Sequence, residues 1–255
     1  MKSRPSLTCC AEKSLLRSAF CGFIAFDAGR SPSRRRLSAG QMINQPVEPE
    51  RDCPHCPRLV EYRQKLRREH SDWFNAPVPS FGSLSASILV VGLAPGVSGA
   101  NRTGRPFTGD AAGEILYPAL KMAGLAQGVY RADLQDDFQL VSCRVTNAVR
   151  CVPPQNRPLT RECVNCSTFL RSEIGAMPRL KIILALGAVA HRTVQIALNL
   201  PKTHMLFAHG ATHSIGKGWL LVDSYHCSRQ NIASGRLTAA MFLKLLTKVN
   251  RLLST

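Results

Sequence analysis

Residues 87–110 have the sequence SILVVGLAPGVSGANRTGRPFTGD, and this stretch decides the fold. Its first six residues form a near-continuous apolar run, which is typical of a strand buried on both faces of a sheet. A glycine-rich loop follows over 94–110. Residues 111–125 then carry apolar residues at helical spacing: Ile115, Leu116, Ala119, Leu120 and Ala123. The pattern predicts a strand, a loop and a helix, which is the repeating unit of a parallel sheet.

The same pattern recurs along the chain. Buried-strand signatures are found at 138–145, 181–186 and 219–223, and helical periodicity at about 188–199 and over 238–253. Strands that alternate with helices indicate a parallel sheet covered on both faces. We therefore expect an α/β fold, a three-layer αβα sandwich with a central four-stranded parallel sheet.

The segment from Cys56 to His70 predicts a basic amphipathic helix ahead of the sheet. Its apolar positions are Leu59, Tyr62 and Leu66. Basic residues are predicted on its other faces: Arg63, Lys65, Arg67 and Arg68.

Three polar loops leave the carboxyl ends of the predicted strands, at 94–110, 146–158 and 224–237. Ligands of parallel sheets bind beyond these ends. The first loop has glycines that let backbone N–H groups approach a ligand, and it carries the polar side chains of Asn101, Arg102, Arg105 and Asp110. It has neither the Gly-Lys-Ser/Thr ending of a Walker loop nor a Gly-x-Gly-x-x-Gly fingerprint. Taken alone, it is an anion- or base-binding loop or a tight turn.

Length and charge limit the classes of protein. The chain has 255 residues with 33 Lys+Arg against 16 Asp+Glu, a formal charge of +17 that attracts polyanions. No apolar run approaches the roughly 18 residues of a membrane span, so we expect no membrane association. We also expect a cytoplasmic location and a monomer. Residues 1–41 are predicted to be a basic disordered extension or a misplaced start, and residues 42–255 a single domain.

Four of the ten cysteines form two groups. Cys53-Pro-His-Cys56 precedes the basic helix, and Cys151 and Cys166 lie in the segment CVPPQNRPLTRECVNC. Two such groups indicate a metal site, in which zinc and an iron–sulfur cluster share the ligand set and base rates favour zinc. A redox dithiol is disfavoured because no strand precedes the pair, and disulfides because no convincing signal peptide is present. Free thiols are expected at Cys143, Cys163 and Cys227.

Five motifs occur in a characteristic order: DCPHCPRLV at 52–60, GLAPG and GANRTGRPFTGD within 92–110, TNAVRCVPPQNRP at 146–158, NC at 165–166 and SYHCSRQNIASGRLT at 224–238. Together they resemble the uracil-DNA glycosylase superfamily, and within it the iron–sulfur type 5 enzymes. The resemblance implies a [4Fe-4S] cluster in place of zinc, on Cys53, Cys56, Cys151 and Cys166.

The resemblance also implies a DNA repair glycosylase, which hydrolyses the N-glycosidic bond of uracil and other deaminated bases in double-stranded DNA. Such an enzyme flips the base out of the stack and stabilises the negative charge that develops on it. The implied catalytic residues are His226, as hydrogen-bond donor to the base anion, Asn101, to orient the attacking water, and Asp110, as a base or a loop anchor. The implied base-binding residues are Gly92, Leu93, Ala94, Phe107, as a stacking platform, and Asn147, which reads the Watson–Crick edge.

Two positions depart from the superfamily pattern. Ala94 stands where members with strong uracil activity carry Asp or Glu, an absence that the type 5 group shares. It implies reliance on leaving-group stabilisation and a broader pocket that admits deaminated purines. Cys227 replaces the usual proline after His226. The loop beyond it has candidates for phosphate contact and for filling the gap left by a flipped base: Arg229, Gln230, Asn231 and Arg236.

Two alternatives remain at this stage. One is a non-catalytic nucleic-acid-binding protein with a structural metal cluster, and the other is a zinc-binding interaction module. The charge supports a nucleic-acid partner both for a glycosylase and for the non-catalytic binding protein, because residues 201–255 carry seven basic residues against Asp223 alone. We therefore expect binding that weakens steeply with salt.

Overall fold

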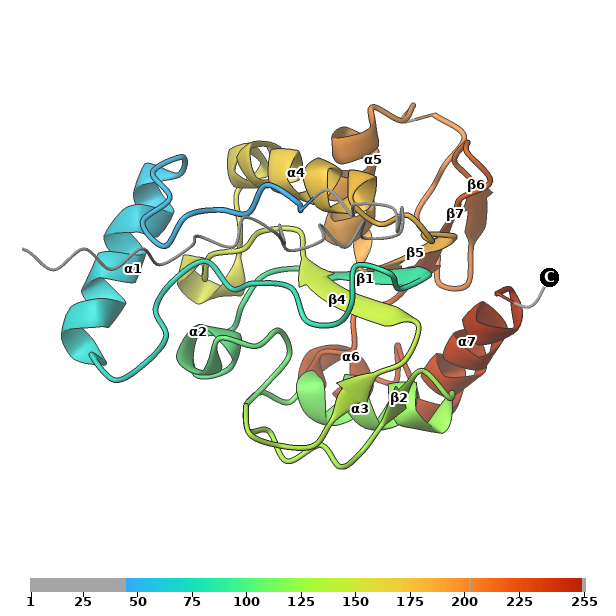
Figure 1. Ribbon diagram of the computed structural model, residues 1–255, viewed down its shortest axis with the longest axis horizontal. Helices are drawn as coiled ribbons and strands as arrows, with labels where there is room; N and C mark the ends of the chain where they lie inside the picture. Colours follow the sequence, from blue (N-terminus) through green and yellow to red (C-terminus); the bar gives the residue numbers. More distant parts are fainter. Residues whose placement is uncertain (1–44, 202, 254–255) are drawn as a thin grey trace, which may run out of the picture. The chain divides into compact units, whose positions relative to one another are not determined.

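The computed structural model describes residues 45–201 and 203–253 of the chain. Its centre is a five-stranded sheet in the order β4-β1-β5-β7-β6 (Figure 1). The strands are β4 (Cys143–Asn147), β1 (Ile88–Gly92), β5 (Ile182–Leu186), β7 (Leu220–Ser224) and β6 (Thr212–Ser214). β4, β1, β5 and β7 are parallel to one another, and β6 is antiparallel to β7. The predicted α/β fold is confirmed.

The fifth strand corrects the prediction of a four-stranded sheet. β6 is three residues long, and its sequence Thr-His-Ser is polar and not buried. A turn brings it against β7, with the Ile215 N–H donating to Trp219 O at 3.0 Å and the Trp219 N–H donating to Gly216 O at 2.8 Å. Because the strand has no apolar run, hydrophobic periodicity does not reveal it.

The predicted strand at 138–145 is wrong as a single element. The chain forms β3 (Gln139–Leu140), which pairs with β2 (Ala126–Gln127) in a separate antiparallel ribbon, and then β4. Ser142 lies between them with a left-handed backbone, at φ 51°. That turn directs the chain into the main sheet, and β4 continues two residues beyond the predicted end.

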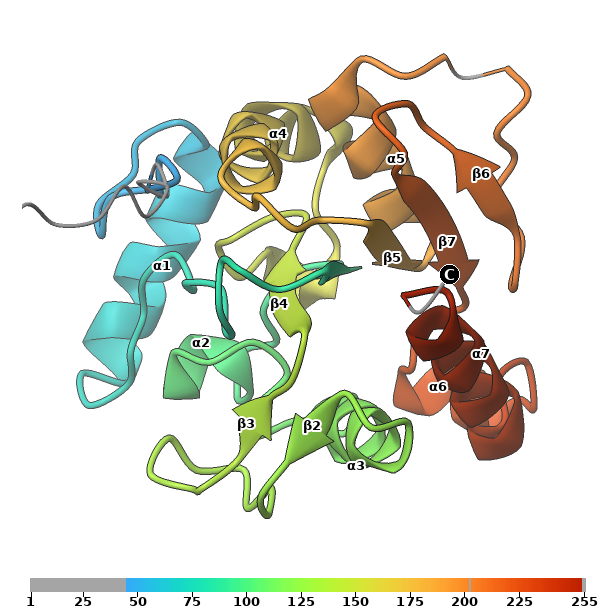
Figure 2. The ribbon, with the colours of Figure 1, turned by 45° about the vertical axis from the view of Figure 1, so that its right-hand side comes forward.

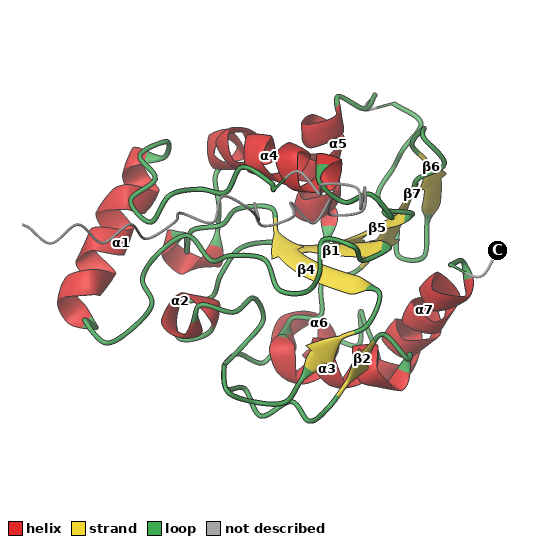
Figure 3. Cartoon of the chain, in the orientation of Figure 1, coloured by secondary structure: helices red, strands yellow, loops and turns green. Residues whose placement is uncertain are grey.

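Helices cover both faces of the sheet, as the cartoon shows (Figures 2 and 3). One face packs against α3 (Gly113–Met122) and α7 (Ala239–Arg251), and the other against α4 (Thr160–Gly175) and α5 (Ala188–Leu198). Alternate residues of β1 enter the two cores, Ile88 and Val90 on the first side, Leu89 and Val91 on the second. The three-layer sandwich is thereby confirmed.

The predicted basic helix is α1 (Pro57–Glu69). Its apolar positions Leu59 and Leu66 are buried as expected, but the prediction that Arg63 lies on an exposed face is wrong. Arg63 is only 2% exposed, because its guanidinium donates to the Cys53 carbonyl at 3.1 Å and to the Cys151 sulfur at 3.5 Å. One of the five arginine and lysine residues of this helix therefore points into the protein.

Three further helices interrupt segments that we expected to be loops. α2 (Ala100–Thr103) lies in the glycine-rich loop, η1 (Pro154–Asn156) follows β4, and α6 (Arg229–Ala233) follows β7. α4 was also not predicted, because proline residues at 153, 154 and 158 precede it. No helix in the described ranges has the length and apolar character that a membrane crossing requires. The predicted extension at 1–41 lies outside the described residues.

Candidate active site

The carboxyl ends of β1, β4 and β7 converge on one small cavity, as the position of the polar loops predicts. The predicted residues among its lining come from three loops far apart in sequence: Ala94, Phe107, Asp110, Asn147 and His226. Backbone and small side chains complete the wall at Pro95, Gly96, Ala100 and Ala112. The structure thus brings three of the five predicted base-binding residues together with two of the three predicted catalytic residues.

Gly92 does not line the cavity, but two lining residues approach it so closely that only glycine fits there. It is paired with Asn147 across β1 and β4. A Cβ atom on Gly92 would lie 2.4 Å from the Asn147 Oδ1 atom and 2.4 Å from the Phe107 Cζ atom. The missing side chain therefore leaves the space in which Asn147 and Phe107 meet.

Phe107 forms one wall with an unusual backbone. Its φ of 52° is in the left-handed region, which few residues other than glycine adopt. The ring is 5% exposed, and its centroid lies 6.0 Å from that of the His226 ring, with the two planes at 26°. Two nearly parallel rings therefore border the cavity.

His226 follows β7 by two residues and is held by its own loop. Asn231 on α6 donates its Nδ2 hydrogen to the His226 carbonyl at 2.8 Å, and Ser228 caps α6 through the Asn231 N–H. Burial lowers the pKa of His226 below its ordinary value, although the Asp110 carboxylate opposes the shift. At neutral pH the ring is therefore uncharged and carries one N–H that it can donate.

Asp110 lines the cavity and also anchors α3. Its Oδ1 atom accepts hydrogen bonds from Ala112 N at 3.1 Å and Gly113 N at 3.0 Å. Asn101 differs, because it is buried but does not line the cavity; only its neighbour Ala100 does. Its Nδ2 donates to Asn75 Oδ1 at 2.9 Å, and its own Oδ1 is buried without a hydrogen-bond partner in the described chain. The structure leaves that oxygen able to accept a hydrogen bond.

A second, more open cleft adjoins the cavity, with His226 in both linings. Leu93, Tyr225, Asn231 and Arg236 are in its wall. The Arg236 guanidinium lies 4.7 Å above the Tyr225 ring, which fixes its direction by a cation–π contact. Among the predicted DNA-binding residues, Arg229 and Gln230 are instead exposed on α6.

Cys227 has a plain structural explanation. Its side chain is fully buried in the main core, and the sulfur donates to Ala112 O at 3.6 Å. Burial raises the pKa of this thiol to about 12. The residue therefore ties the loop that carries His226 to the start of α3, so a proline is not needed to hold it.

The four cysteines predicted as ligands line a separate site between α1, α4 and the segment after β4: Cys53, Cys56, Cys151 and Cys166. Three of their sulfur atoms accept hydrogen bonds. The donors are Asn165 Nδ2 to Cys56 at 3.5 Å, Arg63 Nη1 to Cys151 at 3.5 Å and the Arg150 N–H to Cys166 at 3.4 Å. All seven cysteines in the described ranges are free thiols.

Comparison with known proteins decides the family. Residues 79–250 match the family model described as the uracil DNA glycosylase superfamily, which is more than half of the chain. The chain belongs to the uracil-DNA glycosylase superfamily. The matched region of this superfamily includes every residue of the cavity but begins after Cys53 and Cys56.

Individual relatives in the superfamily extend the similarity. The chain is 42% identical over 205 residues to the type-5 uracil-DNA glycosylase of Thermus thermophilus, covering 78% of this chain and 93% of the relative. It is 42% identical over 200 residues to that of Mycobacterium leprae, covering 74% and 86%. A type-4 uracil-DNA glycosylase of Pyrobaculum aerophilum is 36% identical over 145 residues, covering 56% and 60%. The similarity to the two type-5 proteins thus extends over more residues than the similarity to the type-4 protein.

The sequence does not reveal two buried polar clusters in the described part of the chain. In the first, Arg105, one of the polar side chains of the glycine-rich loop, is buried against Asp136 and does not line the cavity. In the second cluster, Asp223 at the end of β7 accepts from His191 at 2.8 Å and lies 3.2 Å from His213, three residues before His226. No local pattern signals either cluster, since the partners lie 10 to 32 residues apart along the chain.

Proposed function

We propose that this protein removes uracil and other deaminated bases from double-stranded DNA by hydrolysing the N-glycosidic bond. The observation that carries the proposal is the cavity in which Phe107, Asn147 and His226 meet at the carboxyl ends of three parallel strands. Membership of the superfamily and the similarity to type-5 uracil-DNA glycosylases support a DNA repair glycosylase. The cavity supplies the chemistry for that activity.

Recognition begins with a base that has left the duplex, because its glycosidic bond is not accessible in the stack. Flipping costs a few kcal/mol and is easiest for mispaired, deaminated bases. The Phe107 ring offers a face for stacking. The Asn147 amide has both a donor and an acceptor for the Watson–Crick edge, by which uracil differs from cytosine. Ala94 leaves space where a larger acidic side chain would narrow the cavity for purines.

Cleavage separates an anionic base from a sugar with cationic character. A neutral His226 donates its N–H to the oxygen on which the negative charge develops, and an uncharged donor needs no counterion in a buried site. Removing one such donor typically lowers a rate by about 10²–10³. The Asp110 carboxylate also lines the cavity, and its charge favours the sugar cation. The unpaired oxygen of Asn101 is the group we assign to orienting the water, through a small movement of α2.

A [4Fe-4S] cluster is our proposal for the four-cysteine site. The donor set fits such a group, because N–H groups directed at sulfur stabilise thiolates and tune iron–sulfur clusters. Spacing also favours a cluster over a single zinc ion. Thiolates on one zinc lie about 3.8 Å apart, whereas within the described ranges no three of these sulfur atoms lie within 4.8 Å of one another. Held by Cys53, Cys56, Cys151 and Cys166, such a group would join the start of α1 to α4 and leave cleavage to the residues of the cavity.

The DNA partner fits the charge around the open cleft. Arg236 lines this cleft with His226, and Arg229 is exposed on α6. Both belong to residues 201–255, which carry seven basic residues and one acidic residue. Phosphate contacts from such residues orient a duplex without reading its sequence. We assign Arg229, Gln230 and Arg236 to DNA contact, and Asn231 to holding the His226 loop.

The experiment is a base-release assay on duplexes that differ at one position: uracil, hypoxanthine, xanthine, ethenocytosine or thymine. We expect alkali-labile abasic sites with uracil and with at least one deaminated purine, and none with thymine. A His226→Ala preparation from the same host controls for contaminating glycosylase. Tight duplex binding without release of any base would contradict the proposal and favour a non-catalytic binding protein.

A further inference from the structure

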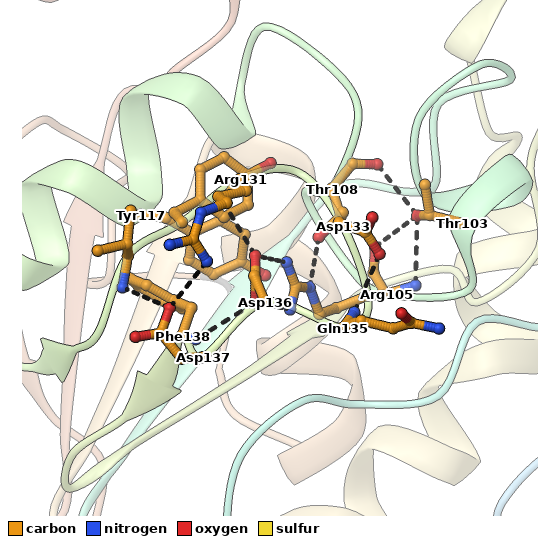
Figure 4. Close-up of polar contacts among 12 residues, drawn as sticks. Thr103, Arg105, Thr108, Tyr117, Arg131, Asp133, Gln135, Asp136, Asp137 and Phe138 are labelled. Carbon is orange, nitrogen blue, oxygen red and sulfur yellow. Dashed lines mark hydrogen bonds and ion pairs between the residues drawn. The ribbon is translucent and has the colours of Figure 1, made fainter.

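The loop that carries Phe107 is joined to a second segment by a buried ion pair. Arg105 donates to both oxygens of Asp136, at 2.8 Å and 2.7 Å (Figure 4). The two side chains are 6% and 0% exposed. Asp136 belongs to the segment 131–138, which precedes β4 and contributes no residue to the cavity or the adjoining cleft. A charged pair at such depth is strongly directional, because both partners lose their water.

The surroundings allow Arg105 one orientation. Its Nε donates to Thr108 Oγ1 at 2.8 Å, and its guanidinium lies 5.1 Å from the Phe81 ring centroid and 5.8 Å from that of Tyr117. Asp136 also accepts from the Arg131 and Phe138 N–H groups, at 3.1 Å and 3.3 Å. Burial by itself raises the pKa of Asp136, but these hydrogen bonds outweigh it and the pKa lies below the ordinary value. The pair therefore stays ionised at neutral pH.

The residues between Arg105 and Thr108 are fixed by further contacts. The Tyr117 hydroxyl donates to the Pro106 carbonyl, the Tyr130 hydroxyl donates to the Phe107 carbonyl at 3.1 Å, and Thr103 Oγ1 donates to the Thr108 carbonyl at 3.1 Å. Phe107 itself has the positive φ described above. A strained residue persists only where its surroundings determine its conformation, and here Arg105 and Thr108 hold it from both sides.

We propose that the Arg105–Asp136 pair is a positioning device for Phe107, through which the segment 131–138 sets the stacking surface for a flipped base. The inference rests on the proposed function, since stacking requires a base in the cavity. Neither Arg105 nor Asp136 touches the substrate. Their effect passes through the Phe107 backbone, so it disappears when the Phe107 ring is absent.

The chain offers a matched control in the next residue. Asp137 forms an ion pair with Arg131 at 3.3 Å, and both side chains are 62% exposed. Asp137→Asn removes one carboxylate charge from the same segment, as Asp136→Asn does, but leaves the buried pair intact. A general effect of charge or of loop mobility would appear in both variants, whereas positioning of Phe107 is altered only by Asp136→Asn.

The test compares binding of two duplexes. One contains a 2′-fluoro-deoxyuridine, which keeps its base, and the other a tetrahydrofuran abasic analogue, which has no base to stack. We expect Asp136→Asn to weaken binding of the uracil analogue about tenfold and to change binding of the abasic analogue less than twofold. Asp137→Asn changes neither by more than twofold. Equal weakening of both duplexes by Asp136→Asn, or no effect, overturns the inference.

A double-variant cycle with Phe107→Ala gives the sharpest result. If Asp136 acts through Phe107, Asp136→Asn in the Phe107→Ala background causes no further loss. Additive losses would show a separate structural role and overturn the inference. Arg105→Lys, which keeps the charge but not the bidentate geometry, serves in the same cycle if Asp136→Asn does not fold. Absence of base release by the wild-type protein in the assay described above would instead contradict the proposed function.

Discussion

The cavity and the four-cysteine site share the end of β4 and the segment that follows it, but they differ in what faces inward. Asn147 at the end of β4 lines the cavity, and Cys151, four residues later, lies in the cysteine site. The cavity presents a polar amide, a carboxylate and an imidazole around a space for a ligand. In the cysteine site, sulfur atoms pack among Leu59, Val149 and Phe169. We therefore propose that one site performs chemistry and the other holds helices together, so that substitutions at the two sites should change different measured properties.

The largest effect is expected for Cys151→Ser, which removes a proposed cluster ligand and breaks the junction of α1 with α4. We expect loss of bound iron and of absorbance near about 400 nm, and a fall in Tm of more than roughly 10 °C, since about 1 kcal/mol shifts a domain of this size by 2–4 °C. Iron content, absorbance and thermal unfolding measure it.

The matched control at the cysteine site is Cys163→Ala. Cys163 lies in the same apolar cluster and is buried to a similar degree, but we do not assign it as a ligand. It should keep full iron content. Equal loss of iron in both variants would contradict the ligand assignment and with it the comparison.

Asn147→Ala should lower the cleavage rate on uracil by roughly tenfold to a hundredfold, because a hydrogen bond to a buried polar edge contributes about 1–3 kcal/mol. Bound iron should be unchanged, although Cys151 lies only four residues away. Single-turnover cleavage and iron analysis of the same preparation measure both. Iron loss in this variant would mean that the two sites are not separate.

Removal of a positive charge in the open cleft should weaken DNA binding by a smaller, salt-dependent amount. Arg236→Ala deletes one phosphate contact, which lowers the slope of log binding constant against log salt by about 0.9. Binding measured between low and moderate salt gives the slope. An unchanged slope would place Arg236 outside the DNA contact, with Tyr225 as its sole partner.

The smallest expected effect is the change in the free energy of unfolding that protonation of His226 causes. Burial lowers its pKa in the folded state, so the unfolded chain takes up the proton first as pH falls below about 6.5. The unfolding free energy therefore decreases with falling pH from that point until the folded ring also protonates. NMR titration should give a pKa below 6.5, and His226→Gln should lose this part of the pH dependence. A titration at or above 6.5 would contradict the neutral donor.

Much of the fold follows from the sequence because apolar runs such as Ile88–Val91 leave only buried strands as an explanation. The cavity was predictable for a similar reason. Asn147 ends β4 and His226 follows β7, and the carboxyl ends of parallel strands lie at the same edge of the sheet. What the sequence did not reveal depends on distant partners. Arg63 and Arg105 belong to basic, polar segments, and partners far along the chain, the sulfur of Cys151 and the carboxylate of Asp136, help to explain why they are buried. β6 was not predicted, because its pairing with β7 makes it a strand and its polar composition does not indicate one.

The most direct test is the cleavage rate of His226→Ala on a duplex with a single uracil, measured under single turnover beside the Tm and iron content of the same protein. The account predicts a rate lower by about 10²–10³, with iron unchanged and Tm within a few degrees of the wild type. An unchanged rate would contradict the assignment of catalysis to this cavity, and loss of iron would contradict its separation from the cysteine site.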